Sequence, residues 1–86
     1  MNIEKAVGAE LSACRRKRNI SQEQLGFDAA IHRTYVSLIE RGVKSPTLGV
    51  LFRLCRALDV PPAKFVRNVQ LRLERKDKEN TPEKTS

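Results

Sequence analysis

The residue types that most often carry out chemistry in proteins are few in this chain and stand apart from one another. His32 is the only histidine, and no nucleophile or second acid accompanies it for it to activate. Cys14 and Cys55 have no second cysteine or histidine at metal-ligand spacing. A glycine-rich phosphate loop is also missing from the sequence. We therefore predict no enzyme activity, no cofactor, no metal site and two reduced thiols in the core.

Positive charge is the feature with chemical meaning. The formal net charge is +7, and thirteen of the 17 basic residues but only six of the 10 acidic ones precede Glu74. The excess therefore belongs to the body of the chain, which would concentrate polyanions such as nucleic acid around itself. With three Phe, one Tyr and no Trp, the chain offers no aromatic platform for stacking RNA bases, so DNA is the favoured polyanion.

The remaining bulk properties indicate one small domain in the cytoplasm. A chain of 86 residues has room for a single core. No apolar run approaches the roughly 18 residues of a bilayer span, and the N-terminus does not read as a secretory signal. We expect a cytoplasmic protein with no membrane partner.

The elements that must position any recognition chemistry are helices, because apolar residues recur at helical spacing and the aromatics that favour sheets are scarce. A first helix is expected from about Ile3 to Arg18, ended by Asn19 in the left-handed conformation. Its inward stripe is Ile3, Val7, Leu11 and Cys14. The composition and this periodicity predict an all-α fold.

Two short helices follow in a helix-turn-helix arrangement. Ser21 is a good N-cap, and Gln24 three residues later would complete a capping box for a helix to about Ala29. A turn over residues 30–32, in which His32 acts as a cap or loop residue, leads to a helix from Arg33 to Glu40. The inward residues of that helix are Val36 and Ile39, and Arg41-Gly42 ends it.

Two further helices are predicted after the loop 44–46. Thr47 caps the fourth, whose inward residues are Leu48, Leu51, Leu54 or Cys55, and Leu58. Pro61 and Pro62 begin the fifth, whose apolar stripe is Phe65, Val66, Val69 and Leu73. Val66, Val69 and Leu73 could close the monomer core or form a dimer contact, and spacing alone does not separate these cases. Residues 1–73 would form the domain, and residues 74–86 a disordered charged tail.

Ser21-Gln22-Glu23-Gln24-Leu25, followed by His32-Arg33-Thr34-Tyr35-Val36-Ser37-Leu38-Ile39-Glu40-Arg41-Gly42, strongly resembles the phage-repressor and Cro (XRE-like) helix-turn-helix domain. Arg33-Thr34-Tyr35 is similar to the controller proteins of bacterial restriction-modification systems. The resemblance covers about Val7 to Phe65. It implies a five-helix, lambda-repressor-like domain that acts on transcription as a homodimer. Two recognition helices would enter successive major grooves of double-stranded DNA, about 34 Å apart, on a pseudo-palindromic operator.

The resemblance also implies roles for individual residues. The base-contacting side chains would be Arg33, Thr34, Ser37 and Leu38. Leu38 departs from the polar residue often found there, so a thymine methyl is its expected partner. Gln22, Tyr35 and Lys44 would contact phosphates. Arg15 and Glu40 would form a partly buried salt bridge.

Alternatives remain at this stage. Arg33, Thr34 and Ser37 could be solvated helix residues, and Tyr35 a packing residue. The same fold also serves antitoxin-type regulators, which bind a partner toxin in addition to DNA. No second domain remains to sense a small molecule, so no such ligand is expected. The operator sequence, the regulated genes and the direction of regulation are not written in the protein.

Overall fold

Five helices make up the computed structural model, which describes residues 1–80 and has no strand within them. They are α1 (Ile3–Lys17), α2 (Gln22–Ala29), α3 (Arg33–Glu40), α4 (Leu48–Leu58) and α5 (Pro62–Asn80). The all-α fold predicted from the sequence is therefore confirmed. Among the described residues, no helix has the length and apolar character needed to cross a membrane.

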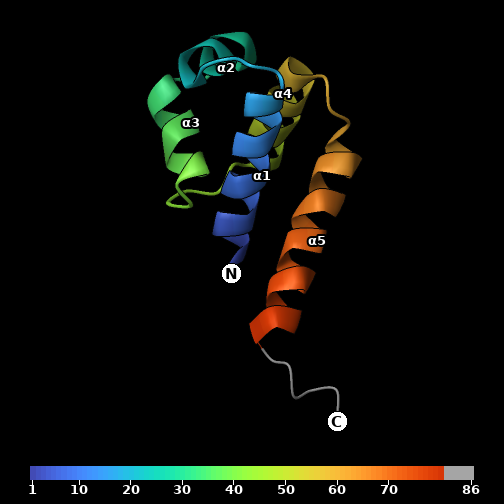
Figure 1. Ribbon diagram of the computed structural model, residues 1–86. Coiled ribbons are helices and arrows are strands. Elements are labelled where there is room, and N and C mark those ends of the chain that lie inside the picture. Colours follow the sequence, from blue (N-terminus) through green and yellow to red (C-terminus); the bar gives the residue numbers. More distant parts are fainter. Residues whose placement is uncertain (81–86) are drawn as a thin grey trace.

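Helix α1 occupies the middle of the molecule, with α3 on one side of it and α5 on the other (Figure 1). Helix α2 packs against both α3 and α4. Helix α5 runs antiparallel to α1, so that its last described turns lie near the N-terminus (Figure 1). Since α1 touches both α3 and α5, it connects the two outer parts of the fold.

The N-termini of α2, α3 and α4 are capped by the side chains that the sequence predicts. Ser21 Oγ accepts a hydrogen bond from the Gln24 amide N–H at 3.0 Å, and Thr47 Oγ1 accepts one from Val50 at 3.2 Å. His32 Nδ1 accepts from the Thr34 N–H at 3.0 Å, so the single histidine is a cap.

The predicted capping box is only half present. The Gln24 side-chain amide donates to Asp28 Oδ1 at 2.8 Å and does not reach back toward Ser21. A partner four residues along the same helix face is within easy reach of this side chain and takes its place.

The core is formed by apolar side chains from all five helices. Its largest fully buried members are Phe65, Leu11, Leu25, Ile39, Leu54, Leu58, Val36 and Cys55. The inward positions predicted for Ile3, Leu48 and Val66 are wrong, because these side chains are 53%, 70% and 51% exposed. Ile3 and Leu48 are the first residues of their helices and lie beyond the edge of the core.

The stripe on α5 divides between the two roles that the sequence left open. Val69 is 5% exposed and belongs to the monomer core, so it offers little surface to a second chain. Leu73 is partly buried and packs against the same core. Val66 alone of the three projects into solvent.

A buried carboxylate that the sequence did not predict joins α1 to α5. The Glu10 side chain is 8% exposed and accepts hydrogen bonds from Asn68 Nδ2 and Arg72 Nε, both at 2.9 Å. The Cys14 thiol is a third donor at 3.4 Å. Because a buried charge is tolerated only when it is paired and hydrogen-bonded, this cluster holds α5 in one position against α1.

Both cysteines are free thiols, in line with the sequence prediction. Burial raises the pKa of Cys55 to about 11. Burial also raises the pKa of Cys14 to about 11, with a further contribution from the neighbouring Glu10 carboxylate. Neither thiol therefore carries appreciable thiolate, the nucleophilic form, at neutral pH.

Helix α5 is longer than the sequence predicts. It continues past Leu73 to Asn80, where a disordered segment was expected from Glu74. Glutamate, lysine and arginine are good helix formers, and the Gln70 amide donates to the Glu74 carboxylate at 3.1 Å across one turn. The rest of the predicted tail, residues 81–86, lies outside the described residues.

Gly8 allows α1 to touch the last turn of α3 directly. A Cβ at this position would lie 2.7 Å from the carbonyl oxygen of Glu40 and closer still to that of Ile39. These are backbone atoms, which cannot move aside as a flexible side chain can. The separation of α1 and α3 therefore depends on the missing side chain.

We predict that Gly8→Ala destabilises the protein by about 1–3 kcal/mol, because the added methyl group overpacks the α1–α3 contact. Gly49→Ala is the matched control, since its Cβ would meet nothing within 4 Å. That change should stabilise the helix by about 0.5–1 kcal/mol through propensity alone. Chemical denaturation of both variants measures the difference, and equal stabilisation by the two substitutions would contradict the close contact.

Candidate nucleic-acid interface

The corner between α2 and α3 is a tight turn closed by backbone hydrogen bonds. Ala30 has φ 61° and ends α2 in the left-handed conformation, and Ile31 N–H donates to the Gly26 carbonyl at 2.9 Å. Gly26 lies against the start of α3, where its Cβ would be 2.7 Å from Ile31 O and 3.2 Å from Arg33 N. The two helices therefore meet backbone to backbone and hold the start of α3 in place.

Helix α3 has one buried face and one open face. Val36 and Ile39 are fully buried in the core. Arg33 and Thr34 are exposed at the first turn, and Ser37 and Leu38 are partly exposed one turn later. Residues four apart lie on the same side of a helix, so the four predicted base-contacting side chains share the open face.

Four of the predicted DNA-contacting residues border one surface hollow. Thr34, Tyr35 and Leu38 of α3 line it together with Lys44 of the following loop. Tyr35 is partly buried and packs against the core, so the packing role considered from the sequence is present alongside its place in this hollow. The geometry thus brings a cation and a phenol beside the open face of α3.

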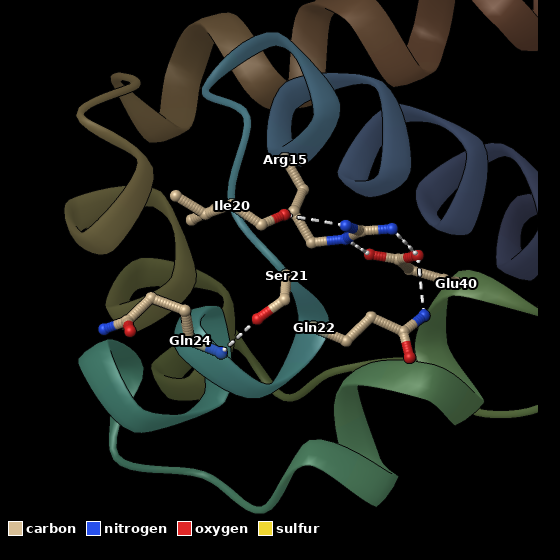
Figure 2. A network of polar contacts seen from close by, with 6 residues as sticks. All are labelled: Arg15, Ile20, Ser21, Gln22, Gln24 and Glu40. Carbon is tan, nitrogen blue, oxygen red and sulfur yellow. Dashed lines mark hydrogen bonds and ion pairs between the residues drawn. The ribbon is translucent and has the colours of Figure 1, made fainter.

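Gln22 stands in a different environment from the one expected. Its side-chain amide donates to Glu40 Oε1 at 2.9 Å, as Figure 2 shows, and the residue is partly buried. One N–H of this amide is therefore used inside the protein, and the first backbone N–H groups of α2 are further free donors. The contact between Gln22 and Glu40 could not be predicted from the sequence, because the two residues are 18 positions apart and on different helices.

Arg15 and Glu40 form the ion pair expected between α1 and the end of α3 (Figure 2). Arg15 Nε lies 2.6 Å from Glu40 Oε2, and Arg15 Nη2 lies 3.1 Å from Oε1. The two side chains are only 14% and 7% exposed. Arg15 Nη1 also donates to the carbonyl of Ile20 at 2.8 Å, and the hydrogen bond to Glu40 raises the pKa of Arg15.

Within the described part of the chain, no three His, Cys, Asp or Glu side chains gather in a way that could hold a metal ion. The chemistry that α3 and its surroundings offer is hydrogen bonding, apolar contact and positive charge on a rigid helix.

This arrangement is matched by a known family. The family model described as Helix-turn-helix matches residues 11–65. The chain belongs to the helix-turn-helix family. The resemblance to the XRE-type branch predicted from the sequence is thereby confirmed, and the family supports a DNA-binding transcription regulator.

Among similar proteins are two that are named control proteins. C.SmaI of Serratia marcescens is 32% identical over 74 residues, which cover 86% of this chain and 88% of that protein. C.BamHI of Bacillus amyloliquefaciens is 46% identical over 46 residues, which cover 54% of this chain and only 57% of that protein.

Solved structures give the same result. The restriction-modification controller protein C.AhdI of Aeromonas hydrophila has a TM-score of 0.70 and 32% identity, over 72% of this chain and 94% of that one. A variant of the controller protein C.Esp1396I has a TM-score of 0.80 over 87% of this chain and 97% of its own, and at 21% identity it shows the shared fold.

We predict that Arg15→Ala lowers stability by about 3–5 kcal/mol, because it leaves the buried Glu40 carboxylate without its charged partner. Thermal unfolding measures the loss. Arg16→Ala is the control, since Arg16 is exposed on the same turn and should change the melting temperature little. Adding Glu40→Gln to Arg15→Ala should restore part of the loss, and an unchanged melting temperature in the single variant would refute the role of the pair.

Proposed function

We propose that this protein is a sequence-specific, DNA-binding transcription regulator that acts as a homodimer, and that it is the controller protein of a restriction-modification system. The observation that carries the proposal is the open face of α3. Arg33, Thr34, Ser37 and Leu38 lie on it, and the Arg15–Glu40 pair and the α2 corner hold the helix in place.

Recognition would follow from the chemistry of these side chains in the major groove. The planar fork of Arg33 matches the O6 and N7 acceptors of guanine, and Thr34 and Ser37 can donate to or accept from base edges. Leu38 would contact a thymine methyl group. These residues are in the first and second turns of α3, the part of a recognition helix that reaches the bases.

Phosphate contacts would set the position of the helix without reading sequence. Lys44 and Tyr35 border the hollow beside α3, where they can meet the backbone flanking the groove. The first turn of α2, with the N–H of Gln22, offers a helix N-terminus to a second phosphate. Each neutralised phosphate releases counterions, so affinity should fall steeply with salt.

The homodimer would form through an apolar surface of α4 and α5. Phe52 is 54% exposed and lines a hollow together with Val60 and Pro62 and with two arginines, Arg53 and Arg56. Val66 is one turn beyond Pro62 on α5 and extends this surface, which we call the α4–α5 face. An isologous contact through this face would relate two α3 helices by a two-fold axis, as a pseudo-palindromic operator requires.

We prefer the hypothesis of a controller protein to that of an antitoxin-type regulator, because two of the similar proteins are named control proteins. The family is one of DNA-binding regulators, and we infer that the chain has no enzymatic role. Such a regulator would act on nucleoid DNA in the bacterial cytoplasm, without a small-molecule ligand. Its effect on transcription would depend on where the operator lies relative to the promoter.

Selection of duplexes from a random pool at about 0.15 M salt tests the reading function, since this salt suppresses much of the phosphate-driven background. We expect a two-fold symmetric site. Arg33→Ala should lose about 1–3 kcal/mol of discrimination at one base pair in each half-site while the protein stays folded. Arg16→Ala, an exposed change on α1, is the control. Absence of any consensus from folded wild-type protein would refute the proposal.

The α4–α5 face is tested by Phe52→Glu, which places a carboxylate in the centre of the proposed contact. Because Phe52 is outside the core, the monomer should remain helical while the dimer dissociates. Sedimentation measures the change in mass. Phe27→Glu is the matched control, since Phe27 is 82% exposed on α2 and is not among the residues that line the hollow. A Phe52→Glu protein that remains dimeric would place the interface elsewhere.

A further inference from the structure

The only described polar partner of Arg33 in the structure is an acidic residue at the start of α2. Glu23 Oε1 lies 3.9 Å from Arg33 Nη1, and the two side chains are 76% and 65% exposed. Gly26 is one turn after Glu23, and it is the residue whose backbone lies against the N and Cα of Arg33. The close approach of the two backbones therefore keeps the main chains of Glu23 and Arg33 near each other.

The charge of α2 is opposite in sign to the net charge of the chain. Its two charged residues, Glu23 and Asp28, are both acidic in a chain of net charge +7. A helix N-terminus ordinarily attracts phosphate, and the Glu23 carboxylate in the first turn of α2 weakens this attraction without removing the N–H donor of Gln22. Glu23 thus places a negative charge next to the arginine proposed to read a base.

The geometry of the contact leaves the reading edge of Arg33 free. Glu23 approaches Nη1, so the Nε and Nη2 donors remain available as a parallel pair for guanine O6 and N7. A long, exposed side chain otherwise loses much rotamer freedom when it binds. Partial restraint by Glu23 reduces that loss for the pose that reads guanine.

We propose that Glu23 is a specificity-determining positioning residue for Arg33. Its carboxylate restrains the guanidinium for base reading and repels phosphates that would otherwise take Arg33 as a nonspecific anchor. The proposal rests on the proposed function, in which Arg33 reads a base pair. Removing the charge of Glu23 should then weaken discrimination between sites more than it changes the affinity for the best site.

A purely stabilising role for Glu23 gives a different outcome. An acidic residue in the first turn of a helix interacts favourably with the helix dipole, and an exposed ion pair adds little. In that case Glu23→Gln would lower the melting temperature slightly and leave the preference among DNA sites unchanged. The ratio of dissociation constants therefore separates the two roles.

The experiment uses the duplex selected by wild-type protein and a second duplex in which the Arg33-dependent base pair is replaced. Fluorescence anisotropy gives the ratio of the two dissociation constants for wild type, Glu23→Gln and Asp28→Asn. The control, Asp28→Asn, removes the same charge from the same helix, but Asp28 is bonded to Gln24 and not to Arg33. We expect Glu23→Gln to reduce the ratio by about three- to fivefold, the effect of an exposed ion pair, and Asp28→Asn to leave it unchanged.

A combined variant completes the test. In an Arg33→Ala background, Glu23→Gln should have no further effect on the ratio, since the residue through which it acts is gone. Glu23→Asp, which keeps the charge, should retain part of the discrimination. An unchanged ratio in Glu23→Gln, or an equal drop in Asp28→Asn, would overturn the inference while leaving the proposed function intact. If Arg33→Ala discriminated between the two duplexes as well as wild type does, the proposed function itself would be refuted.

Discussion

The position of α3 depends on the hydrogen bonds and the ion pair that the Glu40 carboxylate accepts. This residue ends the helix that presents Arg33 and Thr34, and its carboxylate is almost completely removed from water. A charge in such a place is stable only while its donors stay in place, and these come from Arg15 of α1 and Gln22 of α2. Any rotation of α3 would break several charge-assisted bonds at once. The open face of the helix is therefore held in one orientation before it meets DNA.

A second buried and hydrogen-bonded carboxylate lies on the other side of α1. Glu10 accepts from Asn68 and Arg72 of α5, whereas Gly8 and Arg15 face α3. Two buried carboxylates thus connect α3, through α1, to α5, which is one of the two helices of the proposed dimer face. Glu10 belongs to α1, and Glu40 of α3 is bound by Arg15 of α1. In a homodimer formed through the α4–α5 face, the distance between the two α3 helices would depend on the position of α1 in each protomer. Polar contacts of this kind define a geometry more sharply than apolar packing, which tolerates sliding.

The structural features that could be predicted from the sequence are those that depend on residues close together in the chain. The caps Ser21, His32 and Thr47, the corner after Ala29 and the buried pair Val36 and Ile39 all follow from spacing over a few residues. Glu10 was missed because a charged residue in an amphipathic helix is usually solvated, and its partners are 58 and 62 residues away. The exposure of Val66 and the burial of Val69 could not be predicted from the sequence either. Both residues fit the same helical stripe, and only the packing of α5 on α1 distinguishes them. The side chains of the site could be named from the family motif, but the bond that occupies Gln22 depends on tertiary geometry.

The long separation between Glu10 and its partners also has a consequence for how the protein is made. Glu10 leaves the ribosome early, and it stays in water until Asn68 and Arg72 have emerged and α5 can dock. The contacts among Arg15, Gln22 and Glu40 involve only α1, α2 and α3, so they do not require α5 directly. The α4–α5 face is completed last. A growing chain would thus acquire its recognition helix before it could pair with a second copy, and translation would have to reach α5 before the protein could hold two half-sites together.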